Sequence, residues 1–201
     1  MLGLPKATEL SKQLPKKAIY AKFKMNTAEK EKIDKDISRI TIVNEVSPSK
    51  VSLSAGEEVN SFFVILVALK RKDFSEKTVV TLSNLIPQNL IMILQYEDEA
   101  KLAAYRSKLL QTEWKPLKDL TICLQGLNFD KVWENIIIQI GGMNLENGNS
   151  LDEQIEVDSK KEKINKEIEK LEKQARAEKQ PKKKFELVAK IKALKKEMGD
   201  I

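Results

Sequence analysis

The run SFFVILVAL at residues 61–69 holds eight consecutive apolar residues, from position 62 to position 69. A strand that is buried on one face alternates apolar and polar residues, whereas a strand covered on both faces is apolar throughout. About 20 apolar residues are needed to cross a bilayer, so this run is too short to span a membrane. We therefore predict a central strand that is covered on both faces of a sheet.

A second apolar run, NLIMILQY at residues 89–96, has the same character. Between the two runs, Ser75 is placed to cap a helix and Pro87 is placed to end it. The apolar residues of this helix share one face, and they are Val79, Leu82, Leu85 and Ile86. A strand, a helix and a second strand in this order predict a right-handed crossover between two parallel neighbours.

Weaker strand patterns flank this pair. β-Branched residues indicate a strand at residues 39–46 and a shorter one at residues 50–53. A four-residue acidic turn at residues 97–100 predicts an antiparallel hairpin that continues through residues 101–106. Residues 120–124 are a candidate edge strand. The sequence therefore predicts a sheet of about five strands.

Helices are expected at both ends of this region. Prolines and an Asn-capped acidic turn predict two or three short helices within residues 1–38, which form an N-terminal helical arm. Residues 130–140 carry a wide apolar face, so we expect them to form a helix that closes the domain against the sheet. The predicted fold class is α/β, with a mixed sheet and flanking helices. An α+β arrangement is the alternative.

The last fifty residues follow a different pattern. Apolar residues recur there at alternating steps of three and four in two stripes, which are Val157, Ile164, Ile168, Leu171 and Ala175, then Leu187, Ile191, Leu194 and Met198. Pro181 separates the stripes and interrupts a helix, so the pattern predicts a coiled-coil-like antiparallel helical hairpin. Gly and Asn are enriched just before it. We therefore place an α/β domain at residues 1–142, a flexible linker at 143–150 and the hairpin at 151–201.

Composition excludes several kinds of chemistry. The 201 residues carry a net charge of +6, and they include no His and a single Cys, Cys123. Without His, the Ser-His-Asp and Cys-His nucleophilic sites and the zinc sites built from His and Cys are excluded. One Cys cannot form an internal disulfide, and no apolar segment follows the positive charges near the start. We therefore expect no secretory signal and a cytoplasmic location.

Motifs for nucleotide and metal chemistry are missing as well. The sequence contains neither of the glycine-rich phosphate loops, G-x-x-x-x-G-K-[ST] and G-x-G-x-x-G. Residues 27–96 are expected to follow the element order of many metal-dependent nuclease cores, which need acids on adjacent central strands. The predicted strands at residues 50–53 and 62–69 lack those acids, and Glu99-Ala100-Lys101 falls at a predicted hairpin tip. We predict no enzyme, and therefore no catalytic residue, cofactor or metal ligand.

Two groups of lysines are candidates for contact with a nucleic-acid backbone. One group lies on the N-terminal arm among aromatic residues, and the other forms a basic turn at the tip of the hairpin. They are Lys16, Lys17, Lys22 and Lys24 on the arm, and Lys182, Lys183 and Lys184 at the tip. The alternative is that both groups are only solvated. Because the net charge divides evenly along the chain, we expect any such binding to be weak.

The hairpin also carries a candidate protein interface. A two-helix hairpin buries little apolar area by itself, so we expect a further surface to cover part of its stripe. The candidate residues are Ile164, Ile168, Leu171, Leu187, Ile191 and Leu194. The expected partner is either a second copy, paired through residues 151–201, or another protein.

Short motifs along nearly the whole chain together resemble a bacterial family known as domain of unknown function 4391. The motifs are Gly3-Leu4-Pro5 with Thr8, Ile40-Thr41-Ile42 with Ser47-Pro48, residues 73–87, Trp114, Leu124-Gln125-Gly126-Leu127 and residues 178–187. The resemblance implies genes that are often encoded beside DNA helicases and DNA methyltransferases of restriction-like or phage-defence systems. It supplies no functional residues.

We therefore predict a non-enzymatic accessory subunit of such a DNA-processing system, which docks on a helicase or methyltransferase through its hairpin. The alternative is a DNA-binding or nuclease-like component with a degenerate metal-dependent nuclease core. Neither alternative involves a membrane.

Overall fold

The computed structural model describes residues 2–145 and 149–199. The chain divides into two compact units, Met1–Asn144 and Leu145–Ile201, and the division falls within the predicted linker at residues 143–150. Residues 146–148 of that linker lie outside the described residues, as do residue 1 of the predicted domain and residues 200–201 of the predicted hairpin.

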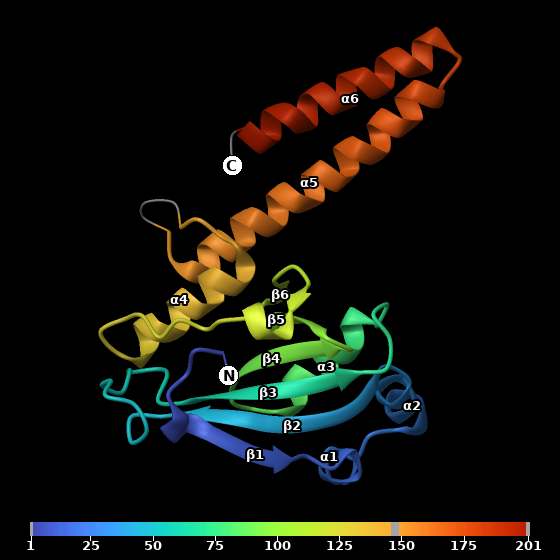
Figure 1. The fold of residues 1–201 in the computed structure, drawn as a ribbon. Coiled ribbons are helices and arrows are strands. Elements are labelled where there is room, and N and C mark those ends of the chain that lie inside the picture. Colours follow the sequence, from blue (N-terminus) through green and yellow to red (C-terminus); the bar gives the residue numbers. More distant parts are fainter. Residues whose placement is uncertain (1, 146–148, 200–201) are drawn as a thin grey trace. The chain divides into compact units, whose positions relative to one another are not determined.

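The first unit is built on a mixed sheet (Figure 1). Its strands lie side by side in chain order, and they are β1 (Glu9–Gln13), β2 (Ile37–Val46), β3 (Phe62–Leu69), β4 (Asn89–Tyr96), β5 (Glu99–Arg106) and β6 (Lys108–Gln111). A seventh short strand, β7 (Lys115–Pro116), pairs with β5. β3 and β4 are parallel, and the other pairs are antiparallel. The predicted parallel pair and central strand are confirmed.

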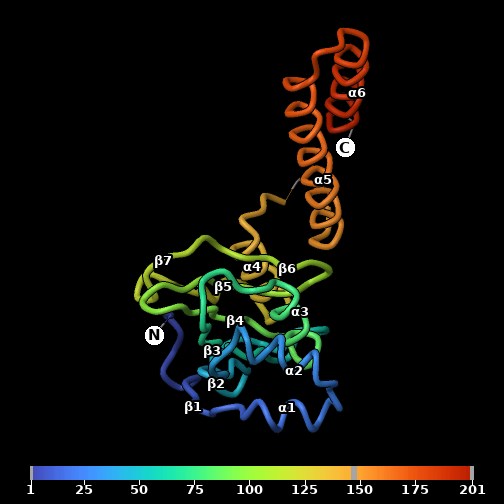
Figure 2. Tube along the Cα trace, turned by 90° about the vertical axis from the view of Figure 1, so that its right-hand side faces the viewer, coloured from blue at the N-terminus to red at the C-terminus, as the bar shows by residue number. Residues whose placement is uncertain are grey.

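Helices cover both faces of β3. Alternate side chains of a strand point to opposite faces of the sheet, so neighbouring residues of β3 pack against different helices. On one face Ile65 and Val67 belong to a core that also contains Ile19 and Ile33. That core is formed with α1 (Lys16–Lys22), α2 (Thr27–Asp36) and α3 (Glu76–Leu85), and Figure 2 shows α2 and α3 on one side of the strands. On the other face the ring of Phe62 lies 6.3 Å from that of Phe129 in α4 (Phe129–Gly141), the predicted closing helix.

The N-terminal arm differs from the prediction. Residues 9–13 form β1 at the edge of the sheet rather than part of a helix, and a short 3-10 turn, Lys6–Thr8, precedes them. The buried Asn44 amide on β2 donates a hydrogen bond of 2.9 Å to the Thr8 hydroxyl, which fixes the start of β1 beside its neighbour. Pairing with β2 therefore outweighs the weak local preference of this segment.

Two of the predicted strands do not form, although the structure describes their residues. Residues 50–53 turn back on themselves, since the Lys50 N–H donates to the Ser47 carbonyl at 2.9 Å. In residues 120–124, Ile122 donates one backbone bond, to the Leu2 carbonyl at 3.0 Å, and no ladder forms. The expected acidic turn is also shorter, because residues 99 and 100 already belong to β5. β6 and β7 were not expected.

A buried carboxylate holds the start of α3. Ser75 occupies the predicted cap position, but its side chain makes no capping hydrogen bond. Instead Asp36, at the end of α2, accepts hydrogen bonds from the Ser75 N–H at 3.0 Å and from the Thr78 hydroxyl at 2.9 Å. Arg71 donates to the same carboxylate at 2.9 Å. Burial alone would raise the pKa of Asp36, but these bonds outweigh burial and lower it.

The second unit is the predicted helical hairpin. α5 (Leu151–Ala177) begins at a capping box formed by Ser150 and Glu153, and residues 178–180 connect it to α6 (Pro181–Gly199). Across the pair, the Lys195 ammonium donates to the Glu172 carboxylate at 2.9 Å. None of the helices in the described ranges is both long and apolar enough to cross a membrane.

Candidate functional site

The six predicted interface residues lie together inside the hairpin. Ile164 and Ile168 of α5 and Ile191 of α6 are buried in one cluster. The remaining members of this seam are only partly buried, and they are Leu171, Leu187, Leu194 and Met198. The stripe therefore holds the two helices together, and it still leaves part of its apolar surface in contact with water.

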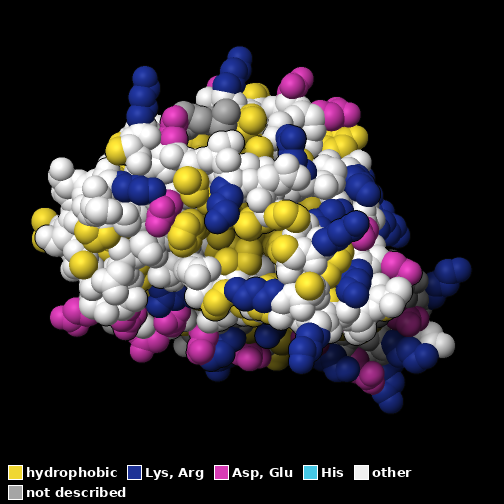
Figure 3. Space-filling model, turned by 90° about the horizontal axis from the view of Figure 1, so that it is seen from below, with side chains coloured by type: hydrophobic (Ala, Val, Ile, Leu, Met, Phe, Trp, Pro, Cys, Tyr) yellow, Lys and Arg dark blue, Asp and Glu magenta, His cyan; other side chains and the backbone are white. Residues whose placement is uncertain are grey.

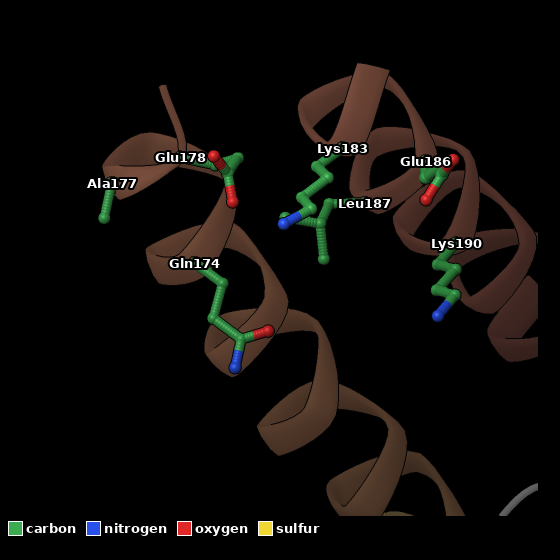
Figure 4. A pocket seen from close by; sticks show the side chains of 7 residues that line it. All are labelled: Gln174, Ala177, Glu178, Lys183, Glu186, Leu187 and Lys190. Atoms are coloured by element: carbon green, nitrogen blue, oxygen red, sulfur yellow. The ribbon is translucent and has the colours of Figure 1, made fainter. Parts of the chain in front are cut away.

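A groove opens between the helices near their connection (Figure 4). It has a volume of about 490 Å³, and its walls are Gln174, Ala177 and Glu178 on one side and Lys183, Glu186, Leu187 and Lys190 on the other. Figure 4 shows Lys183 and Leu187 pointing toward the α5 side. The groove therefore combines an apolar floor with two cations and two carboxylates.

The lysines predicted at the tip lie in a helix. Lys182, Lys183 and Lys184 form the first turn of α6 rather than the connection between the helices. The N-terminus of a helix carries a partial positive charge, so acidic residues normally occupy this position. Three lysines there are electrostatically unfavourable for α6 itself.

Charge is divided unequally between the two helices. α6 contains seven Lys against two Glu, which gives +5, whereas α5 contains seven Lys and Arg against eight Asp and Glu, which gives −1. Within the described part of the chain, Lys195 is the only lysine of α6 that forms an ion pair, and its partner is Glu172. The positive charge of the hairpin is therefore concentrated on one helix.

Sequence reasoning missed two exposed apolar residues on α6. Phe185 is 76% exposed and Val188 is 37% exposed. They lie three residues apart, so they share one face of the helix. Leu187 and Ile191 of the seam lie on another face. The signal that could have found Phe185 is an aromatic residue placed off the apolar stripe of a lysine-rich helix.

The arm lysines of the first unit have different surroundings. Lys16 forms an ion pair with Asp34 and donates to the Ile37 carbonyl at 3.0 Å. Tyr20 donates to the same Asp34 carboxylate at 2.9 Å. The Lys16 hydrogen bond is the main reason that the pKa of Asp34 is lowered. Burial is the main reason that the pKa of Tyr20 is raised, and its bond to Asp34 adds to the effect.

The other arm lysines contact less of the protein. The Lys22 ammonium lies 5.3 Å from the centre of the Phe23 ring. Lys17 and Lys24 are exposed. The aromatic residues between these lysines, Tyr20 and Phe23, pack against the core, as the amphipathic-helix alternative expects.

Glu99 lies at the tip of the β4–β5 hairpin, directly after the turn, and Lys101 lies further along β5. Glu99 pairs with Lys72, and Lys101 lies against two aromatic rings. The Lys101 ammonium is 5.0 Å from the ring centre of Phe74 and 5.1 Å from that of Trp114. Burial lowers the pKa of Lys101. These cation–π contacts join β5 to the segment before α3, which carries Phe74, and to the segment between β6 and β7, which carries Trp114.

An apolar surface is also present on the first unit. Seen from the side of β1 and α1, hydrophobic side chains gather in the middle, with Lys and Arg side chains around them (Figure 3). A groove of about 400 Å³ in the first unit is lined by Leu10 and Val43 together with Glu9, Ser11 and Asn44 of β1 and β2. In residues 2–145 and 149–199 no group of three or more His, Cys, Asp or Glu side chains is placed to hold a metal ion.

Comparison with family models gives one match over nearly the full chain. The family is described as Domain of unknown function (DUF4391), and its model matches residues 2–198. The chain belongs to this family. The DUF4391 match covers both units, so the hairpin is part of the family pattern, and the predicted resemblance is confirmed. Searches of the curated proteins and of the solved structures found no match.

Proposed function

We propose that the protein is a non-enzymatic accessory subunit of a bacterial DNA-processing system, of restriction-like or phage-defence type, and that it docks through the groove of its hairpin. The observation that carries this proposal is the incomplete closure of the seam. Leu171, Leu187 and Leu194 hold the helices together, and yet each remains partly exposed.

Covering these leucines is favourable, because burial of apolar surface contributes roughly 25 cal/mol per Å². Leu187 lines the groove, and Leu171 and Leu194 belong to the same seam. An additional amphipathic helix that occupied the groove and continued along the seam would bury them and complete a helical bundle. The groove walls carry both signs of charge, with Lys183 and Lys190 near Glu178 and Glu186. A helix with a similar mixture of Glu and Lys therefore complements them.

Two occupants of the groove fit this description. One is the hairpin of a second copy, because mixed charges on its flanks can match themselves in an antiparallel pair. The other is a helicase or methyltransferase, the class of partner that the family resemblance implies. The apolar groove at β1 and β2 of the first unit offers a second contact surface to the same partner.

The experiment is co-expression of the full chain with a helicase or methyltransferase, the neighbouring gene product that the family resemblance implies. Leu187→Gln places an amide in the groove, and the matched control Val188→Gln makes the same kind of change one residue away, on an exposed face. We expect Leu187→Gln to lose the complex, or the dimer, in size-exclusion chromatography with light scattering. A Leu187→Gln variant with native helix content and unchanged assembly would contradict the proposal.

A second candidate function is nucleic-acid binding, and the charge of +5 on α6 favours it. Binding through lysines to phosphates falls with salt. We expect weak binding to oligonucleotides at low salt and no Mg²⁺- or Mn²⁺-dependent cleavage of DNA or RNA. Cleavage that disappears in Glu99→Ala would instead support a nuclease.

A further inference from the structure

We infer that the outer face of α6, defined by Phe185 and the lysines beside it, binds single-stranded nucleic acid, with the Phe185 ring stacked on an unpaired base. This inference rests on the second candidate function, nucleic-acid binding, and names the form of nucleic acid and the residue that selects it.

The outer face combines an exposed ring with nearby positive charges. Phe185 is 76% exposed. Lys182, Lys192 and Lys196 stand three, seven and eleven residues from it, and these spacings place them on its side of the helix. A rise of 1.5 Å per residue spreads the three lysines over roughly 21 Å of the helix axis. The ring therefore lies inside a row of cations.

These lysines are exposed, and the ion pairs that the structure gives for α6 involve Lys195 rather than any of the three. Lys182 also stands in the first turn of α6, where the helix dipole disfavours a cation. Sites that break a local rule in this way are often functional. A bound phosphate would remove the conflict, because it brings negative charge to the positive end of the helix.

The exposed ring of Phe185 indicates which kind of polyanion binds these lysines. A duplex offers phosphates but keeps its bases stacked on each other, so an exposed phenyl ring adds nothing to duplex binding. A single strand offers both phosphates and free base faces, and every base can stack on an aromatic ring. An anionic membrane requires a continuous apolar face, whereas the exposed large apolar residues of α6 are only Phe185 and Val188 within the described residues.

The proposed strand site and the docking groove lie on different faces of α6. Phe185 and Leu187 are two residues apart, which corresponds to roughly 200° around the helix. Leu187 lines the groove, whereas Phe185 does not. Changes at the two positions therefore test the two functions separately, and loss of partner docking leaves the strand site intact.

The test measures binding of the full chain to a fluorescent 20-nucleotide oligo-dT, to a duplex of equal length and to phosphatidylserine vesicles. Phe185→Ala should weaken binding to oligo-dT by roughly 5- to 100-fold, the loss expected for one stacked base, and change duplex binding less than twofold. Phe185→Trp should restore the affinity, and oligo-dT should quench the added indole fluorescence.

Lysine variants test the electrostatic half of the site. Lys192→Gln should lower the slope of log affinity against log salt by about 0.7 for oligo-dT. The matched control is Lys170→Gln, an exposed lysine of α5 that should leave the slope unchanged. Two results for Phe185→Ala would overturn the inference: equal losses of affinity for oligo-dT and duplex, or an unchanged affinity for oligo-dT. For the native protein, tighter binding to vesicles than to oligo-dT, or no binding to oligo-dT at low salt, would also overturn it.

Discussion

Several lysines of the first unit contact other side chains, whereas most lysines of α6 have no ion-pair partner among the described residues. Lys16 pairs with Asp34, Lys72 pairs with Glu99, and Lys101 lies between two aromatic rings. On α6, three lysines occupy the helix end where cations are disfavoured. These lysines of the first unit therefore contribute to its folded structure, whereas the three lysines in the first turn of α6 are unfavourable for their own helix.

The two units also differ in how completely they bury apolar residues. Phe62, Val64 and Val67 of β3 are fully buried. In the seam of the hairpin the buried residues Ile168 and Ile191 retain 6% and 8% exposure, and the leucines beside them are only partly covered. The core of the sheet is therefore closed more completely than the seam of the hairpin.

The largest expected effect tests the scaffold. Phe62→Ala removes a ring that packs on Phe129 and on Trp133, whose ring centre lies 5.5 Å away. Loss of a buried aromatic side chain costs about 3–5 kcal/mol, so we expect the first unit to approach unfolding. The measurement is urea denaturation followed by tryptophan fluorescence, since both tryptophans belong to this unit. A decrease in the free energy of unfolding of less than about 1 kcal/mol would contradict the view that the first unit has the more tightly packed core.

The next effect concerns the buried carboxylate. Asp36→Asn should lower the free energy of unfolding by about 2 kcal/mol, because the Asp36 side chain is 3% exposed and holds Arg71. Asp34→Asn is the matched control, and its 49% exposed side chain should contribute less than about 1 kcal/mol. Similar losses in both variants would show that burial does not set the strength of these contacts.

The pH dependence provides a second measurement of the same contact. Because the pKa of Asp36 is lowered in the folded protein, its contribution is complete above the ordinary value of about 4 and is lost as the pH falls through the folded value. The stabilities of the wild type and Asp36→Asn should therefore converge in acid.

A smaller effect is expected in the seam of the hairpin. Ile191→Ala should reduce the stability of the hairpin by about 2 kcal/mol, the low end for such a change, because the seam relaxes more easily than a closed core. Helical circular dichroism should fall at lower temperature while tryptophan fluorescence from the first unit is unchanged. A single shifted transition in both signals would mean that the units unfold together.

The smallest predicted effect has the opposite sign. Lys182→Glu should stabilise α6 by about 0.5 kcal/mol, because it places an anion at the positive end of the helix. Melting of the hairpin followed by circular dichroism at low salt measures the change, and salt should reduce it. Destabilisation by this variant would remove the argument that the lysine of the native protein is unfavourable for its own helix.

Patterns with a single strong period predicted the structure well. The unbroken apolar run gave β3, and the two stripes separated by Pro181 gave α5 and α6. In each case the local pattern and the tertiary contacts favour the same structure. The six seam residues were therefore grouped correctly, and their role as an interface stays a prediction.

The elements that could not be predicted depend on distant partners. β1 forms because β2 and the Thr8–Asn44 hydrogen bond hold it, and no local pattern records that contact. Residues 120–124 have apolar alternation, yet Leu2 provides only one backbone partner. Phe185 was missed because the periodicity of the seam identifies buried positions, whereas Phe185 is exposed.

The order of the strands has a consequence for how the first unit folds. From β1 to β6 each strand lies beside the next one in the chain. Each strand can therefore add to the edge of the growing sheet once the loop before it has closed. No strand has to insert between two strands that are already paired. Such a topology keeps contact order low for a sheet protein, and low contact order favours rapid folding. We expect folding to grow outward from β3 and β4, with the pair of β1 and β2 joining last.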